Sequence, residues 1–420
     1  MQHIKKLVVL SRESGPEISR RGFVHDAVAA GCGAALALST SRLGLADEAA
    51  TPSAVPAEAR PIKSLRPLDD SILRLGGHGD NWHMTWAKDD TTYVGLCDGK
   101  GLPGTKQGFF NSRVYTIAGD PPDVSFADVP GYPDLPFGVQ WFYGFGILAL
   151  DDSIYHYLTT PKHSLTQPDP IFIGAKLIYS RDGGRTWHNQ DGTTPVVWED
   201  FSQRSRETMV FFQEPNNSFA LITVLQMGRN YEHNRDGFVY LFSPNGDAEG
   251  TMNQLALCRV SKDKLLKRAE YQFFAGREGD NGARWSDRVE DRSPVHEFPA
   301  GWVNKYLNPY AWHPSVVYFP ATGQYLMANW GMGTDATGKW FTKPSYLGFW
   351  TAPEPWGPWM QVHEDQSWTP GGEQAARAYQ PQIAPQWIAA DGSSFWLVWT
   401  DFGQDMRHYA FNAQRVDVHY

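Results

Sequence analysis

The residues with the clearest chemical potential are two aspartates, Asp80 and Asp98, at the ends of one short segment, DNWHMTWAKDDTTYVGLCD. Apolar and polar residues alternate between them, which is typical of a half-buried β-hairpin. A turn centred on Asp89 would place Asp80 directly opposite Asp98. Cross-strand neighbours have Cβ atoms about 4.5–5.5 Å apart. The pattern therefore predicts two carboxylates side by side on one face of the ribbon.

Two neighbouring carboxylates are the chemical groups of glycoside hydrolysis. Mutual repulsion and burial raise the pKa of one, so a protonated acid and an ionised base can coexist near neutral pH. One protonates the leaving oxygen, and the other attacks the anomeric carbon or activates water. A separation of about 5–5.5 Å predicts retention of configuration, and about 6.5–9.5 Å predicts inversion; the hairpin favours the shorter distance. Aspartate is also a common turn residue, so purely structural roles are the alternative.

Further residues are candidates for contacting a sugar. Trp82 falls on the same predicted face as the two aspartates, and flat aromatic rings stack on the C–H faces of sugars. Aromatic side chains and a lone histidine are also common structural residues, so each candidate has a structural alternative. The predicted substrate-binding residues are Asn81, Trp82, Trp141, Tyr143, Glu232, Asp236 and His313.

The spacing of histidines and cysteines predicts no metal site, and no cofactor is expected. No H-x-x-x-H or C-x-x-C pattern occurs in the chain. A calcium ion in a central channel stays an open alternative. Cys97 and Cys258 are too few for a disulfide framework, and we expect buried thiols.

The rest of the sequence must supply the elements that hold these residues. Short strand-like runs separated by turn residues recur from about residue 66 onward, and no helical pattern exceeds about two turns. The runs fall into five groups, at 70–125, 135–195, 206–275, 305–365 and 379–420. The 40 Gly, 29 Pro and 14% aromatic residues fit many strands and turns. We predict an all-β, single-domain, five-bladed β-propeller over residues 66–420, with a jelly roll or double sandwich as the alternative.

Two segments bear on the propeller prediction. SRDGGRTW, from Ser180 to Trp187, fits the Asp-box turn pattern S-x-D-x-G-x-T-W that is common in sialidase-like propellers. In such a turn Asp182 accepts backbone N–H groups and Trp187 packs into the blade, so its expected role is structural. The long polar segment 277–306 carries several charges, and we expect an insertion that caps the pocket.

The N-terminus has the pattern of an export signal. Paired arginines, Arg20 and Arg21, precede an Ala-rich apolar run, which resembles a twin-arginine signal. Charged residues interrupt the run, so a membrane anchor fits less well. We predict a signal peptide at 1–46, a Pro/Ala-rich linker at 47–65, and a secreted or periplasmic mature protein with no membrane association after cleavage. The net charge of −9 argues against nucleic acid, and neutral or cationic ligands fit better. Because paired carboxylates suit glycoside hydrolysis, the expected partner is a polysaccharide or oligosaccharide.

The segment from Asp80 to Gly101, DNWHMTWAKDDTTYVGLCDGKG, resembles the N-terminal signature of the propeller proteins of glycoside hydrolase family 183, which include bacterial endo-D-arabinanases. Later segments such as WFYGFGILALDDSIYHYL fit the general pattern of that family, and the resemblance covers about residues 75–410. It implies a five-bladed propeller and a retaining, endo-acting cleavage of α-D-arabinofuranosyl linkages in a cell-wall polysaccharide. It also implies Asp98 as nucleophile and Asp80 as acid/base. The segment 277–306 departs from the family pattern.

Two other functions fit a carbohydrate-active propeller. One is non-catalytic, lectin-like binding. The other is a sialidase, which should show several Asp boxes and clustered arginines for the sugar carboxylate. The sequence shows one clear box and scattered arginines, so a sialidase is the weaker alternative.

Overall fold

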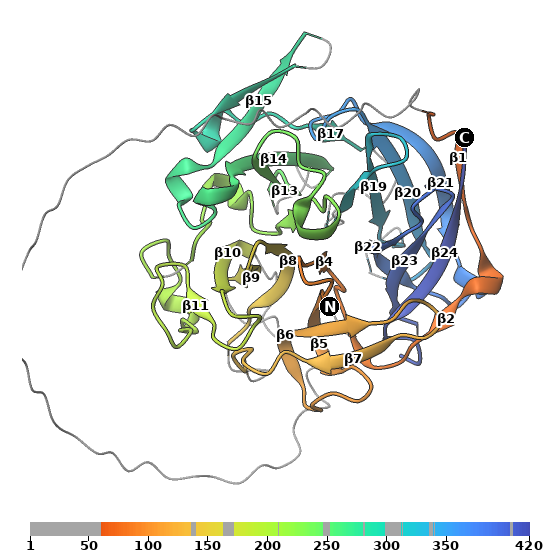
Figure 1. Cartoon of the computed structure of the whole chain (residues 1–420), viewed down its shortest axis with the longest axis horizontal. Coiled ribbons are helices and arrows are strands. Elements are labelled where there is room, and N and C mark those ends of the chain that lie inside the picture. Colours follow the sequence, from red (N-terminus) through yellow and green to blue (C-terminus); the bar gives the residue numbers. More distant parts are fainter. Residues whose placement is uncertain are drawn as a thin grey trace, which may run out of the picture.

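Five antiparallel sheets stand in a ring around one axis in the computed structural model of the protein (Figure 1). The fold is a five-bladed β-propeller, as the strand pattern predicts. The structure describes residues 60–420 except for 136–139, 163–171, 209, 247–252, 280–281, 299–311, 313, 336–338, 340 and 404–405. The predicted signal peptide, most of the predicted linker and His313 lie outside the described residues.

The blades follow one another along the chain, and the first strands of neighbouring blades contact each other around the axis. Blade one contains β3 (His78–Asp80), β4 (Met84–Trp86), β5 (Thr92–Gly101), β6 (Phe110–Ala118) and β7 (Ser125–Asp128). Blade two contains β8 (Tyr143–Leu150), β9 (Ser153–Pro161), β10 (Phe172–Ser180) and β11 (His188–Asn189). Blade three contains β12 (Thr223–Val224), β13 (Phe238–Pro244), β14 (Gln254–Ser261), β15 (Gln272–Glu278), β16 (Gly282–Ser286) and β17 (His296–Glu297).

The last two blades complete the ring. Blade four contains β18 (Ser315–Phe319), β19 (Gln324–Gly331), β20 (Ser345–Ala352) and β21 (Met360–Trp368). Blade five contains β22 (Ala378–Ile388), β23 (Ser394–Asp401), β24 (Asn412–His419), β1 (Ser64–Pro67) and β2 (Leu73–Arg74). The described helices are single 3-10 turns, and none is long and apolar enough to cross a membrane. They are η1 (Asp69–Ser71), η2 (Phe201–Gln203), η3 (Pro215–Asn217), η4 (Arg229–Tyr231), η5 (Lys262–Lys264), η6 (Arg268–Glu270), η7 (Val289–Asp291) and η8 (Pro370–Gly372).

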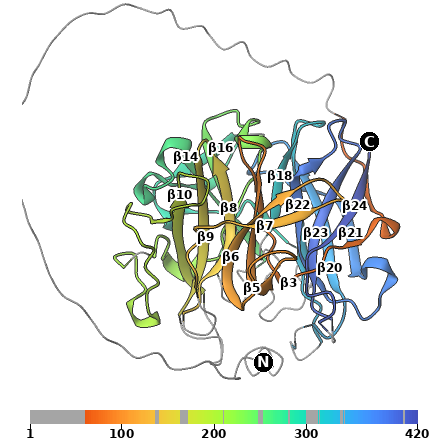
Figure 2. The same ribbon diagram turned by 60° about the horizontal axis from the view of Figure 1, so that its bottom comes forward.

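The strands run across the thickness of the ring, so each blade presents its strand ends on two opposite faces (Figure 2). We call the face at the N-terminal ends of the inner strands, where Asp80 and Tyr143 lie, the site face. The inner strand β8 is buried along its whole length because neighbouring blades cover both of its sides. The outer strand β21 is mostly exposed.

The first strand of the chain closes the ring. β1 pairs antiparallel with β24, from Ser64 opposite His419 to Pro67 opposite Val416. This pairing joins the first and last strands of the described part of the chain and covers an edge of β24. The predicted linker at 47–65 is therefore too long by at least two residues, since β1 begins at Ser64. The strand is short and half polar, so its own pattern does not distinguish it from a linker.

The Asp-box turn has the structural role that was predicted. Asp182 Oδ1 accepts the backbone N–H of Thr186 at 2.9 Å, and Ser180 Oγ accepts that of Gly184 at 2.9 Å. Trp187 is 3% exposed and packs into the core between blades one and two. The turn joins β10 to β11, at the outer edge of blade two.

The long polar segment is part of blade three and not a cap, as far as it is described. Residues 277–278 lie in β15 and 282–286 in β16, which pair with each other, and His296 of β17 pairs with Leu255 of β14. The prediction was wrong because alternating charged residues on an outer, solvent-facing hairpin resemble an irregular insertion. The prediction of buried thiols is confirmed, since Cys97 and Cys258 are both buried and free.

Candidate active site

The hairpin with the two aspartates forms as predicted near its turn and shifts by one residue beyond it. β4 and β5 keep the predicted register, with Met84 opposite Val94. Farther from the turn, Asp80 pairs with Cys97 and not with Asp98. The prediction that the two aspartates are directly opposite each other is therefore wrong by one residue.

The shift has a local cause in the backbone. The inner strand breaks between β3 and β4, where Asn81 has a φ of 58°. Asp98 also has a positive φ, 44°. Residues in this left-handed region place a bulge in the ladder, which alternation in the sequence does not reveal. Such strained, non-glycine positions cluster at functional sites.

The irregular backbone still brings the two aspartates together. The Tyr409 hydroxyl lies 2.9 Å from Asp80 Oδ2 and 3.2 Å from the backbone carbonyl oxygen of Asp98. The charge of Asp80 also acts on the Asp98 carboxyl and raises its pKa. Asp80 is 8% exposed and Asp98 is half-buried. The two aspartates therefore lie near each other around Tyr409, although the ladder does not pair them directly.

Asp80 is surrounded by hydrogen-bond donors. Its Oδ2 accepts from the hydroxyls of Tyr379, at 2.7 Å, and Tyr409, at 2.9 Å. Its Oδ1 accepts from Asn81 Nδ2 at 2.9 Å. Donors of this kind stabilise a carboxylate in its ionised form.

Asp98 has one side-chain donor on its carboxyl. Asn111 Nδ2 donates to Asp98 Oδ1 at 2.7 Å. Asn111 is fully buried, and its own Oδ1 accepts the backbone N–H of Phe142 at 2.6 Å. Since the amide oxygen is already used by Phe142, the nitrogen must face Asp98, and the orientation of the Asn111 amide is fixed.

These surroundings separate the proton affinities of the two carboxyls. Burial raises the pKa of Asp80 to about 6, against the opposing effect of hydrogen bonds from Tyr379, Tyr409, Asn81 and Cys97. Burial and the charge of Asp80 raise the pKa of Asp98 well above its ordinary value, and Asn111 alone opposes the rise. These surroundings favour ionisation of Asp80 before Asp98 and favour the protonated form of Asp98.

The raised pKa of Asp80 predicts a pH-dependent cost in stability. An unfolded aspartate titrates near 3.9, so between about pH 4 and pH 6 the folded protein binds more protons than the unfolded chain. The free energy of unfolding therefore falls as pH rises through this window, by about 3 kcal/mol for a shift of about two units. We expect Asp80→Asn to be increasingly stable relative to the wild type from pH 4 to pH 7 in thermal melts. A difference in melting temperature that does not change with pH would contradict this expectation.

The other two candidates in the hairpin do not face a substrate. Asn81 uses its side chain to hold Asp80, and its backbone N–H bonds to Gln380 Oε1 at 3.2 Å. Trp82 is 0% exposed and packs against Phe411 in the core between blades one and five, with ring centroids 5.3 Å apart. The predicted contact between Trp82 and substrate is wrong because the face that Trp82 shares with Met84 and Leu96 is packed into the core and is not open.

Trp141 and Tyr143 lie near Asp98, at the start of blade two. Burial raises the pKa of Tyr143, and the nearby charge of Asp98 raises it further. Both residues are 3% exposed, and their ring centroids lie 6.1 Å apart. The two rings therefore pack beneath the surface near Asp98 and present little area to solvent. Three half-buried rings that pack against them offer apolar area for a sugar on the site face: Phe172, Phe201 and Trp312.

Glu232 and Asp236 are not brought to the aspartate pair. They follow η4, which contacts β4 and β8, and the backbone N–H of Asp151, just beyond the C-terminal end of β8, donates to Asn230 at 2.6 Å. This end of the inner strands belongs to the face opposite Asp80. Asp236 instead accepts the backbone N–H of Phe238 at 3.1 Å. A role for these two residues beside Asp80 is therefore ruled out by their place in the ring.

Sequence reasoning missed three residues that hold the pair. Tyr379 and Tyr409 come from blade five and lie 299 and 329 positions from Asp80, so no local pattern could reveal them. Only closure of the ring brings the first and last blades together. Asn111 could have been found, because the pairing of β5 with β6 places it beside Asp98.

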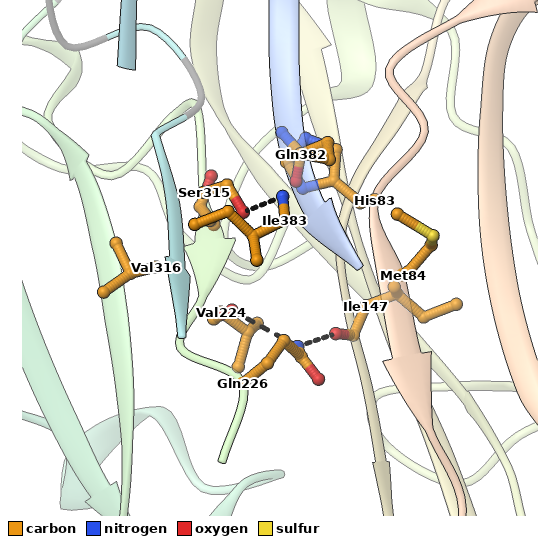
Figure 3. Close-up of a pocket in the computed structure, with 10 residues that line it drawn as sticks. His83, Met84, Ile147, Val224, Gln226, Ser315, Val316, Gln382 and Ile383 are labelled. Carbon is orange, nitrogen blue, oxygen red and sulfur yellow. Dashed lines mark hydrogen bonds between the residues drawn. The ribbon is translucent and has the colours of Figure 1, made fainter. Parts of the chain in front are cut away.

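A small cavity lies on the propeller axis, where inner strands converge (Figure 3). It has about 10 Å³ of space for the centre of a water-sized sphere, enough for about one water molecule. Gln226 Nε2 donates to the carbonyl of Ile147 at 2.9 Å, and Ser315 Oγ accepts the backbone N–H of Ile383 at 2.9 Å. These contacts tie neighbouring blades together. Among the described residues, no group of three or more His, Cys, Asp and Glu side chains is placed to hold a metal ion.

No family model and no curated protein matches the sequence. Solved structures align over most of the chain at low identity. A thermostable family-43 glycoside hydrolase covers 81% of this chain and 88% of its own, with 13% identity and a TM-score of 0.46. The catalytic domain of a Coprinopsis cinerea GH62 α-L-arabinofuranosidase covers 87% and 93%, with 10% identity and a TM-score of 0.41. An endo-arabinase from Bacteroides thetaiotaomicron covers 86% and 98%, with 12% identity and a TM-score of 0.41. Similarity at this level identifies neither an activity nor a substrate of this chain.

Proposed function

We propose that this protein is a secreted glycoside hydrolase that cleaves arabinofuranosyl linkages in a cell-wall polysaccharide, with Asp80 and Asp98 as its two catalytic carboxyls. The observation that carries the proposal is the unequal hydrogen bonding of two adjacent carboxyls. Among the described residues, the side chains of Tyr379, Tyr409 and Asn81 donate to the Asp80 carboxyl at 2.7 to 2.9 Å, and that of Asn111 donates to the Asp98 carboxyl at 2.7 Å. Surroundings that push two pKa values apart in this way produce one acid and one base at the same pH.

The proposed roles reverse the order that the family resemblance implies. Asp80 is the nucleophile, because its donors favour the ionised form. Asp98 is the acid/base, because burial and the neighbouring charge favour its protonated form. Asp80 Oδ2 already accepts two hydrogen bonds and Oδ1 accepts one. Among the hydrogen bonds of the described residues that are placed on one oxygen, Oδ1 accepts fewer than Oδ2, so we assign the attack to Oδ1.

In the first step, Asp98 gives its proton to the glycosidic oxygen while the bond from that oxygen to the anomeric carbon breaks. The electron pair of the broken bond stays on the leaving oxygen. Asp80 Oδ1 attacks the anomeric carbon from the opposite side and forms an ester. Asp98 is left as a carboxylate.

In the second step, the Asp98 carboxylate takes a proton from water as the water oxygen attacks the anomeric carbon. The ester bond to Asp80 breaks, and its electron pair returns to the Asp80 carboxylate. Asp98 regains its proton, so both groups return to their starting states. Two inversions at the anomeric carbon give net retention.

The substrate, the endo action and the export are proposed from the sequence. The motif from Asp80 to Gly101 resembles proteins that act on D-arabinan, and the paired arginines resemble a twin-arginine signal. The half-buried rings beside Asp98 supply apolar faces on which furanose units can stack.

The test is incubation of the purified mature protein with D-arabinan, L-arabinan, xylan and other cell-wall glycans. We expect oligosaccharides from D-arabinan, detected by chromatography and mass spectrometry, and none from a protein that carries both Asp80→Asn and Asp98→Asn. Release from a different glycan alone would overturn the proposed substrate. Binding of D-arabinan without release by the wild type would overturn hydrolysis in favour of lectin-like binding.

A further inference from the structure

One buried arginine, Arg204, has contacts that a stability role alone does not explain. It follows η2 and is 5% exposed. Its Nη1 donates to the carbonyl oxygens of Trp141, at 2.9 Å, and Pro161, at 2.8 Å. Its guanidinium carbon lies 4.0 Å from the ring centroid of Phe142 and 4.3 Å from that of Phe201. A cation is therefore held between two rings by backbone carbonyls.

Burying such a cation is costly unless it is compensated. Burial lowers the pKa of Arg204 to about 10, so the group is still charged near neutral pH. Its Nε also donates to the carbonyl oxygen of Glu199, at 3.3 Å, while the Glu199 carboxylate is bonded to Lys176 at 2.8 Å. Carbonyl dipoles and aromatic faces compensate the charge of Arg204, and the planar, forked guanidinium suits both.

The contacts of Arg204 lead directly to Asp98. Arg204 fixes the carbonyl of Trp141 and packs on the ring of Phe142. The peptide between those two residues carries the Phe142 N–H, which donates to Asn111 Oδ1 at 2.6 Å. Asn111 Nδ2 then donates to Asp98 Oδ1 at 2.7 Å. Both the C=O and the N–H of one peptide group are therefore held, one by Arg204 and the other by Asn111.

We infer that Arg204 is a positioning residue for Asp98, acting through the Trp141–Phe142 peptide and the Asn111 amide. A fixed peptide keeps the Asn111 nitrogen on Asp98 Oδ1. An oxygen that accepts this N–H bond is the carbonyl-like oxygen of the protonated acid, so the transferable proton stays on Oδ2. Arg204 thus determines which oxygen of Asp98 delivers the proton. The inference rests on the proposed hydrolase function and names a residue of that same site.

The experiment compares Arg204→Lys with Asn111→Ala and with the double variant. Lysine keeps the charge and loses the planar fork. We expect kcat to fall about tenfold in each single variant, with KM unchanged, because neither residue reaches the substrate. We also expect the alkaline limb of the pH profile of kcat/KM to move up by about one unit, since Asp98 loses a donor that lowers its pKa. The double variant should match Asn111→Ala alone, because both changes break one chain of contacts.

Arg268→Lys is the matched control. Arg268 lies in blade three over the rings of Phe212 and Phe273, at 4.8 and 5.0 Å, and bonds to Glu214. We expect it to lower the melting temperature without moving the pH profile. If Arg204→Lys does not fold, Phe201→Ala removes one ring from Arg204 and should move the alkaline limb in the same direction by less.

The results of these experiments distinguish a failure of the positioning role of Arg204 from a failure of the proposed hydrolase function. The positioning role would be overturned if the losses of kcat in the two single variants multiply in the double variant. It would also be overturned if Arg204→Lys leaves the pH profile unchanged. Neither result would contradict hydrolysis. A crystal structure of Arg204→Lys gives a readout that needs no activity: we expect the Asn111–Asp98 bond to be lost or loosened. An unchanged bond would overturn the inference even for an inactive protein.

Discussion

Replacing Asp98 with Asn is expected to reduce kcat on D-arabinan by about 10³-fold while binding of the polymer is retained. Proton transfer by a positioned acid contributes about 10²–10⁴-fold. Asparagine keeps the size of the side chain and its Oδ1, so the hydrogen bond from Asn111 survives and the site keeps its shape. The loss should therefore fall on kcat, and KM or the binding constant should change little.

The same variant should respond to the leaving group. An aryl arabinofuranoside whose phenolate leaves without protonation does not need Asp98 in the first step, so we expect Asp98→Asn to form its glycosyl ester at nearly the wild-type rate. Added azide can then replace the water that Asp98 no longer activates, and we expect a glycosyl azide as product. Equal losses on good and poor leaving groups, without rescue by azide, would contradict the role of Asp98 as acid/base.

Asp80→Asn is expected to reduce turnover by about 10⁴-fold on every substrate, whatever its leaving group. An amide cannot form the glycosyl ester, so neither an activated substrate nor an added anion acting on that ester can restore the pathway. The hydroxyls of Tyr379 and Tyr409 can still donate to an asparagine oxygen, so we expect the protein to remain folded. Initial rates on arabinan and on an aryl arabinofuranoside measure the effect.

Asp401→Asn is the control for both aspartate variants. Asp401 is 2% exposed at the end of β23, and burial raises the pKa of its carboxyl. Its Oδ1 accepts the backbone N–H of Arg377 at 2.7 Å, a bond that an asparagine can keep. We expect near wild-type turnover. A loss as large as that of Asp80→Asn would mean that burial of any carboxyl in this region, and not the pair itself, determines activity.

The fold was predictable because its signals are local. Alternation with period two and regularly spaced turn residues indicate strands, and their grouping along the chain predicts blades. Ring closure was not predictable from the same signals. β1 is four residues long and is recognised only by its pairing with β24 at the other end of the chain. The local pattern of residues in a strand does not show which distant strand it pairs with.

The site was predictable only in its two acidic residues. The alternation between Asp80 and Asp98 indicated a hairpin, and that hairpin exists. The positive φ angles of Asn81 and Asp98 accompany a shift of its register by one residue. Non-glycine residues in this conformation break the rule that successive side chains alternate between faces.

The order of the two catalytic roles depends on residues that the sequence places far away. Tyr379 and Tyr409 decide that Asp80 is the more acidic carboxyl, and both come from the last blade. From the sequence of the hairpin alone, the two aspartates cannot be told apart as acid and base, because the hydrogen-bond donors to each carboxyl are not known. For this reason the spacing predicts a pair of carboxyls, and the proposed assignment of nucleophile and acid depends on the assembled ring.

The most direct measurement is mass spectrometry of the protein after reaction with an arabinofuranosyl donor that carries fluorine at C2 and a good leaving group. Fluorine destabilises the positive charge that develops at the anomeric carbon, and the leaving group still allows the first step, so the glycosyl ester accumulates. We predict a mass increase of one fluoro-arabinofuranosyl unit, located on the peptide that contains Asp80. The same unit attached to Asp98, or no adduct on a protein that hydrolyses D-arabinan, would contradict the proposed mechanism.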